Sequence, residues 1–209
     1  MIYLNTVESR TFEVLEELME VKELSNFALV GGTNLSLRFG HRVSVDLDLF
    51  TNERFFPDEV FKGILNQFPS LTKINERGQS LWLNIENIKV DIILHEYPYL
   101  DEVETISGIR FLSVKDIIPM KLEAMASRGV KKDFWDIYEL LKHFNLLEMQ
   151  DFYERKYVNS DFGHVLLSMT YFKDAEIQKE NPIALNGVTW AEVKEKMLIT
   201  VRDYSKGLF

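Results

Sequence analysis

The hydrophobic pattern of this 209-residue chain changes its period near residue 112, and no other feature constrains the fold as strongly. Before that point the apolar residues follow strand patterns, which predict strands at 27–30, 44–50, 71–75, 80–86, 88–95 and 109–112. After it they recur at helical spacing, which predicts helices at 113–127, 132–144, 147–157, 162–171 and 189–204. We therefore predict an α/β domain over residues 1–112 and a helical region over residues 113–209 that packs on it.

Helices are also expected beside the strands of the first half. Residues 7–24 form an amphipathic pattern, and residues 57–68 begin with a proline in the first turn followed by two acids. A short helix is predicted at 33–39, with Thr33 as its N-cap after the turn of Gly31 and Gly32. The first half should therefore be a mixed sheet flanked by helices.

Composition excludes several classes of protein. Hydrophobic residues make up 46% of the chain, but no apolar run approaches the roughly 18 residues that span a membrane. The absence of cysteine excludes disulfides, thiolate metal sites and a cysteine nucleophile. The first eight residues do not resemble a signal peptide, so we expect a cytoplasmic protein with no membrane partner. A net charge of -9 opposes extensive coating of nucleic acid, yet it leaves room for one local basic pocket.

Two carboxylates stand two residues apart in the strand predicted at 44–50. Because alternate residues of a strand share a face, Asp46 and Asp48 should lie beside Ser44, while Val45 and the two leucines enter apolar packing. Adjacent carboxylates repel each other, and a divalent cation such as Mg²⁺ or Mn²⁺ removes that penalty. A solvated edge strand is the alternative, and this motif alone does not decide between them. Ser44 has no partner base that would make it a nucleophile, so we expect it to be structural or to bind phosphate.

Two further features favour a site. Asp91 is embedded in the apolar strand predicted at 88–95, where a carboxylate is costly unless it is paired or bound to metal. Placed beside Asp46 and Asp48, it would complete a three-carboxylate metal cage. Gly31 and Gly32 lie between a strand and a helix, where the backbone can approach a phosphate and the helix N-terminus offers N–H groups.

Charged residues also interrupt the apolar stripes of two predicted helices in the second half. Lys121 and Arg128 lie on the inward stripe of the helix at 113–127 and just beyond it, and Asp133 and Asp136 begin the inward stripe of the next helix. Lys121 could simply extend its charge to solvent, or the four residues could form buried ion pairs. With the three strand carboxylates in the same chain we favour a site, in which Lys121 contacts phosphate and Asp133 orients Lys121 or acts as a base.

These residues together resemble the nucleotidyltransferase superfamily, and more closely the AbiEii/AbiGii toxins of type IV toxin–antitoxin and abortive-infection systems. The matching residues are Gly31-Gly32-Thr33-Asn34-Leu35, Arg42-x-Ser44-x-Asp46-Leu47-Asp48-Leu49-Phe50, Asp91, Lys121, Arg128, Lys132-Asp133 and Asp136. The match extends from Phe27 to about Leu141, with Gly-Gly-Thr where many members of the wider superfamily have Gly-Ser.

The resemblance implies a nucleotidyltransferase fold and a Mg²⁺- or Mn²⁺-dependent enzyme that moves a nucleotidyl group from a nucleoside triphosphate to an acceptor. Asp46, Asp48 and Asp91 would be the metal residues, and Asp91 would help to activate the acceptor hydroxyl. The triphosphate would be bound by the following residues: Gly31, Gly32, Thr33, Arg42, Ser44, Lys121 and Arg128. A cognate antitoxin and an RNA acceptor such as the tRNA 3′ end are also implied.

Two alternatives remain open at this point. The acceptor could be a small molecule or a protein, which the acidic net charge favours slightly, although six basic residues could form a local rim for RNA. These are Arg38, His41, Arg42, Arg128, Lys131 and Lys132. The chain could also be a non-catalytic nucleotide-binding module, which the retained carboxylates and Lys121 oppose.

Overall fold

A computed structural model of the chain describes residues 2–207 and has the predicted α/β class. The chain divides into two compact units. Unit 1 comprises Met1–Gly40 and Ser44–Ser113, and unit 2 comprises His41–Val43 and Val114–Phe209. The short piece His41–Val43 therefore belongs to unit 2 although it is flanked on both sides by unit 1.

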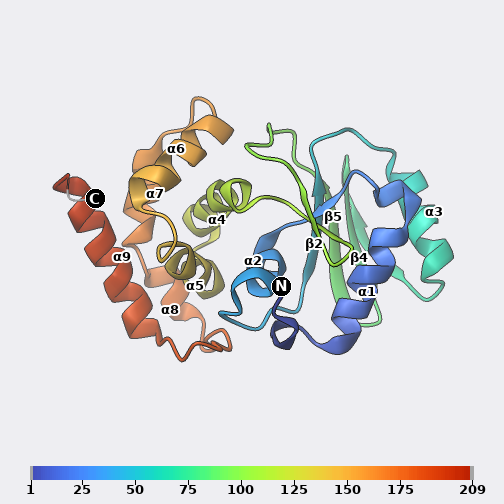
Figure 1. Cartoon of the computed structure of the whole chain (residues 1–209), viewed down its shortest axis with the longest axis horizontal. Helices are drawn as coiled ribbons and strands as arrows, with labels where there is room; N and C mark the ends of the chain where they lie inside the picture. The colour runs from blue at the N-terminus through green and yellow to red at the C-terminus, as the bar shows by residue number, and fades with distance from the viewer. Residues whose placement is uncertain (1, 208–209) are drawn as a thin grey trace. The chain divides into compact units, whose positions relative to one another are not determined.

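Unit 1 is built on a seven-stranded mixed sheet with the strand order β3-β4-β5-β2-β1-β7-β6 (Figure 1). The strands are β1 (Ala28–Leu29), β2 (Leu47–Thr51), β3 (Thr72–Glu76), β4 (Ser80–Ile85), β5 (Ile88–Leu94), β6 (Glu104–Ile106) and β7 (Ile109–Phe111). β2 and β5 run parallel at the centre, and β1 pairs antiparallel with β2. The sequence predicted each of these strands except β6, a three-residue edge strand that is too short to show a period.

One face of this sheet carries the apolar core of unit 1. Alternate residues of β2, β4 and β5 are fully buried there, as the strand period requires. They pack against α1 (Ser9–Glu20) and α3 (Pro57–Gln67), which lie on the same side of the sheet in Figure 1. The opposite face carries the other residues of these strands, including the predicted carboxylates Asp48 and Asp91.

Unit 2 is helical, as predicted, although the short helix at Lys173–Ile177 is not among the predicted ones. Its helices are α4 (Val114–Arg128), α5 (Lys131–Leu140), α6 (Leu146–Lys156), α7 (Phe162–Met169), α8 (Lys173–Ile177) and α9 (Trp190–Ser205). α4 packs against α5, α6 and α7, and α9 packs against the same three helices. An aromatic cluster of Phe134, Trp135, Phe172 and Trp190 joins α5 to α9. No helix within residues 2–207 is long and apolar enough to cross a membrane.

Two local expectations were wrong. The helix predicted at 33–39 is α2 (Gly31–Phe39), whose N-cap is Val30, so Thr33 lies inside the helix and does not cap it. Val45 is 58% exposed and does not enter the core, because regular strand structure begins only at Leu47. The expected alternation does hold for Leu47 and Leu49, which are buried.

Candidate functional site

The candidate residues are divided between the two units. Unit 1 carries the turn of Gly31 and Gly32, Thr33, Ser44 and the carboxylate cluster, by which we mean Asp46, Asp48 and Asp91. Unit 2 carries Arg42, Lys121, Arg128 and Asp133.

Gly31 makes the turn from β1 into α2 in a conformation that other residues rarely adopt. Its φ is +70°, in the left-handed region, and a Cβ atom at this position would lie 2.3 Å from Asp48 Oδ2. No side chain caps α2, and the first N–H groups of a helix have no partner within it. The turn therefore places bare backbone and the N-terminus of α2 next to the Asp48 carboxylate. Its free N–H groups suit an anion, whereas Asp48 repels one unless a cation lies between them.

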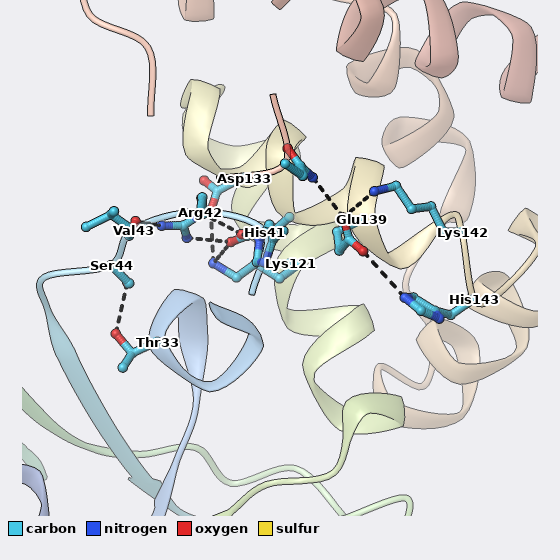
Figure 2. A network of polar contacts seen from close by, with 12 residues as sticks. Thr33, His41, Arg42, Val43, Ser44, Lys121, Asp133, Glu139, Lys142 and His143 are labelled. Atoms are coloured by element: carbon cyan, nitrogen blue, oxygen red, sulfur yellow. Dashed lines mark hydrogen bonds and ion pairs between the residues drawn. The ribbon is translucent and has the colours of Figure 1, made fainter. Parts of the chain in front are cut away.

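Thr33 and Ser44 hold this turn against the chain that leads into β2. The buried Thr33 hydroxyl donates to the main-chain carbonyl of Asp46 and lies 2.9 Å from the Ser44 hydroxyl (Figure 2). The Ser44 N–H donates to Thr6 O at 2.8 Å. Both hydroxyls are thus engaged within unit 1, and they position Asp46. Of the two expectations for Ser44, the structural one has this direct support.

Asp48 and Asp91 are direct neighbours on the parallel strands β2 and β5. Lys89, two residues before Asp91 on the same face, places Nζ 2.9 Å from Asp91 Oδ2. Partial burial lowers the pKa of Lys89, but the hydrogen bond to Asp91 and the charges of all three carboxylates outweigh it and raise that pKa overall. The ammonium of Lys89 is therefore a cation that the carboxylate cluster faces in this structure.

The metal site of the three carboxylates stays a prediction. Between residues 2 and 207, no group of three or more His, Cys, Asp or Glu side chains is arranged to hold a metal ion. We attribute this to repulsion between the acids and to Lys89, which draws one oxygen of Asp91 to itself. The donor set nevertheless fits a divalent cation, because Asp91 Oδ1 is buried with no hydrogen-bond partner and Asp48 Oδ2 faces the bare backbone of Gly31.

In unit 2, Lys121 is buried between two carboxylates of α5. Its Nζ lies 3.3 Å from Asp133 Oδ1 (Figure 2). The same Nζ lies 2.7 Å from Asp136 Oδ2. Lys121 is only 5% exposed, and both aspartates are fully buried. Lys121 therefore does not extend its charge to solvent. The predicted contact between Lys121 and Asp133 is present, within a larger arrangement of buried ion pairs.

Three more residues complete what we call the ion-pair network, which consists of His41, Arg42, Lys121, Arg128, Asp133 and Asp136. Arg42 is 2.7 Å from Asp136 Oδ1 through Nε and 2.9 Å from Oδ2 through Nη2, a two-pronged contact. His41 Nε2 lies 2.8 Å from Asp136 Oδ1. Arg128 binds both oxygens of Asp133, at 2.7 and 2.8 Å, and its side chain is 48% exposed.

The network keeps Asp136, Asp133 and Lys121 ionised. Burial by itself raises the pKa of Asp136, but the charges of Arg42 and Lys121 more than reverse this and hold that pKa well below its usual range. Burial also raises the pKa of Asp133, but Lys121 and Arg128 lower it by more, so this pKa lies below its usual value. Burial lowers the pKa of Lys121, but the charges of Asp136 and Asp133 raise it by more, so this pKa lies above its usual value.

These shifts predict a pH-dependent stability. A carboxyl whose pKa is depressed by folding stabilises the protein above its unfolded pKa, and this stabilisation is lost as the pH falls through the folded pKa. The difference in unfolding free energy between wild type and Asp133→Asn should therefore stay constant from about pH 5 upward and shrink below about pH 4. Urea unfolding of both proteins at a series of pH values measures it. A difference that stays constant down to pH 2 would contradict the depressed pKa.

The sequence does not predict three of these contacts. Asp136 belongs to the motif, but nothing local shows that it is the acceptor shared by Arg42, Lys121 and His41. His41 is predicted only as part of the basic rim, and the contact of Lys89 with Asp91 is not predicted, although the two residues share a face of the strand. The expected basic rim is also corrected at several positions, because His41, Arg42 and Lys131 are buried. Lys131 Nζ donates to Gln178 O at 2.7 Å and to Asn181 Oδ1 at 2.8 Å.

Residues 13–206 match the family model described as nucleotidyl transferase AbiEii toxin, type IV TA system. An uncharacterized protein from Aquifex aeolicus (strain VF5) is 35% identical over 201 residues, which cover 92% of this chain and 94% of that protein.

Two solved structures share the fold. JHP933 from Helicobacter pylori superposes with a TM-score of 0.58 at 17% identity, covering 97% of this chain and 94% of that chain. MenT4, a nucleotidyltransferase toxin from Mycobacterium tuberculosis H37Rv, has a TM-score of 0.57 at 12% identity and covers 94% and 86%.

Proposed function

The chain belongs to the AbiEii family of type IV nucleotidyl transferase toxins, and from this membership we propose that it transfers a nucleoside monophosphate from a nucleoside triphosphate to a hydroxyl group of an RNA acceptor. The acceptor oxygen forms a bond to the α-phosphorus, the bond from that phosphorus to the β-phosphate oxygen breaks, and pyrophosphate leaves. The proton of the acceptor hydroxyl passes to a base, for which we propose Asp91.

One observation supports this proposal above the others, namely the adjacency of Gly31, Asp48 and Asp91. Asp48 Oδ2 lies against the position where Gly31 lacks a side chain, and Asp91 is the direct neighbour of Asp48. A triphosphate at the N-terminus of α2 would therefore have its reacting end beside two carboxylates. The buried, unpartnered Oδ1 of Asp91 is a candidate proton acceptor.

Asp46 and Asp48 are the residues that we propose to hold Mg²⁺ or Mn²⁺, with Asp91 as a third ligand. When bound, such a cation offsets the negative charge of the phosphates and of the carboxylates. The residues of the chain have separate tasks. Thr33 and Ser44 keep Asp46 in place through their hydroxyls, and the N–H groups at Gly31 and Gly32 bind phosphate oxygens.

Three cations of the ion-pair network are candidates for contact with phosphate, and they differ in how exposed they are. Arg128 is half exposed and can present its guanidinium to a ligand while Asp133 orients it. Lys121 stays protonated between two carboxylates and is proposed as the second contact. Arg42 binds Asp136 with two nitrogens and, like Lys121, is buried, so we propose that it positions Asp136 and that Arg128 is the best supported of the three phosphate contacts.

A different acceptor is the second candidate. The net charge of -9 and the burial of Lys131, Arg42 and His41 favour a small molecule or a protein over an extended nucleic acid. Incubation of the protein with each labelled nucleoside triphosphate, Mg²⁺ and total cellular RNA distinguishes the acceptors. Label on RNA supports the proposal, label on protein or on a small molecule supports the second candidate, and no transfer at all contradicts both. Co-expression with a protein encoded beside it tests the proposed toxin role and its antitoxin partner.

Metal binding should stabilise the wild type. A ligand that binds only the native state raises stability by mass action, and a cation also relieves the repulsion among the three carboxylates. Mg²⁺ or Mn²⁺ should therefore raise the melting temperature of the wild type and raise it much less in the double variant Asp46→Asn/Asp48→Asn. An equal rise in both proteins would mean that these carboxylates are not the metal ligands.

A further inference from the structure

The sheet of unit 1 has one face that α1 and α3 do not use, and the carboxylate cluster lies on it. Residues that share a face and a register position are direct neighbours across strands. On this face Asp91 of β5 has Asp48 of β2 on one side and Trp82 of β4 on the other. The residues next to Trp82 along β4, Leu81 and Leu83, point into the core, and Trp82 is partly exposed on the face of the carboxylates.

These side chains form a row across the sheet that continues to the turn at Gly31. On the far side of Asp48, the Val30 N–H donates to Asp48 O at 2.8 Å, and Gly31 follows directly. The row therefore runs from the phosphate turn at Gly31 through Asp48 and Asp91 to Trp82. Neighbouring strands are about 4.8 Å apart, so Trp82 lies one strand, or about 4.8 Å, beyond Asp91 on the side away from the turn. A triphosphate at the turn would therefore be separated from Trp82 by the two carboxylates.

The indole of Trp82 indicates which kind of acceptor would bind over it. An indole offers a flat apolar surface, which binds a nucleobase by stacking and needs no positive charge. Ser80 and Asn84, two residues away on either side along β4, are partly exposed on the same face and supply polar groups beside the ring. Several basic residues that could have bound an RNA backbone are instead buried in unit 2, among them Arg42 and Lys131. An extended RNA backbone therefore lacks these contacts, whereas a single unpaired base at the end of a strand can stack on the indole without them.

We propose that Trp82 is the platform on which the 3′-terminal nucleobase of a single-stranded RNA acceptor stacks, so that its ribose hydroxyl lies over Asp91. This rests on the proposed nucleotidyl transfer, with Asp91 as the proton acceptor. Trp82 is then a residue that determines the choice of acceptor, and the nucleoside triphosphate does not contact it.

The experiment combines a change in the protein with a change in the RNA. The probes are a short single-stranded RNA and the same RNA whose 3′-terminal nucleotide lacks its base. The variants are Trp82→Leu, which removes the ring, and Trp82→Phe, which keeps an aromatic face. Trp82→Leu should raise the Kd and the KM for the normal RNA by about 5- to 150-fold, the range for loss of one base–aromatic stack. The KM for the triphosphate should not change, and Trp82→Phe should retain most of the wild-type affinity.

The abasic RNA tests the contact itself. With wild type it should lose the same factor as Trp82→Leu does, and with Trp82→Leu it should lose little more, because both changes remove one interaction. Losses that multiply, or a Trp82→Leu variant with wild-type affinity, would overturn the platform. Wild type that does not bind this RNA at all would overturn it too.

Binding and transfer are measured separately, so that the two proposals can fail separately. RNA binding that depends on Trp82 without any transfer would contradict the proposed function and keep the platform. Transfer to RNA that is unaffected by Trp82→Leu would keep the function and remove the platform. Transfer that reaches only a protein or a small molecule would reject RNA as the occupant of this face.

Discussion

Gly31→Ala is expected to reduce nucleotidyl transfer by about a hundredfold or more. The new methyl group would lie 2.3 Å from Asp48 Oδ2, which is far inside van der Waals contact, so the carboxylate has to move. A displacement of about 1 Å in a reacting group can cost about a hundredfold in rate. The steady-state rate of label transfer to the acceptor measures the effect, and the metal-induced rise in melting temperature should shrink with it.

The strain that alanine brings to a left-handed backbone has to be separated from this clash. Gly108, in the turn between β6 and β7, has φ +80° and nothing within 4 Å of the added Cβ position. Gly108→Ala should lower the free energy of unfolding by about 1–2 kcal/mol, because a left-handed φ disfavours any side chain. The same backbone strain is expected in Gly31→Ala, where the clash with Asp48 is added to it. Its transfer rate should remain that of the wild type. Equal rates in both variants would show that Asp48 does not need its present position.

Asp136→Ala is expected to lower the free energy of unfolding by about 3–5 kcal/mol, the cost of leaving buried charges without their partner. This one carboxylate accepts hydrogen bonds from Arg42 and His41 and pairs with Lys121 at 2.7 Å, all in a fully buried position. Its removal leaves Asp133 as the remaining acid of the network for Lys121, Arg42 and Arg128. For a chain of this length we expect a fall in melting temperature of roughly 6–20 °C.

Arg155→Ala is the matched control, since it removes another ion pair of unit 2. Arg155 and Asp151 lie one helical turn apart on α6 with side chains 53% and 61% exposed. Such a surface pair contributes about 0.3–0.5 kcal/mol. A melting temperature of Asp136→Ala close to that of Arg155→Ala would mean that the network does not stabilise unit 2.

Much of the fold was open to prediction because its causes are local. The alternation of Leu47, Asp48 and Leu49 and the inward stripe of α4 around Lys121 are periods of two and of three to four residues, which the sequence displays directly. The N-cap predicted at Thr33 was wrong because the local sequence is compatible with two starts of the helix. Thr33 is a good N-cap residue by type, yet Gly31 can adopt a positive φ and starts α2 two residues earlier.

The amino-acid sequence by itself determined most of the strands and helices, the residue types of the candidate site and the shared face of Asp48 and Asp91, because these depend on neighbours within about four residues. The tertiary structure decided which charges meet. Arg42 and Asp136 are 94 residues apart in the chain, and no period or spacing relates them. Likewise, Trp82 adjoins Asp91 only because β4 and β5 pair in this register, and Asp91 adjoins Asp48 only because β5 lies parallel to β2. Contacts of this kind depend on how the chain closes its long loops, which the local sequence does not record.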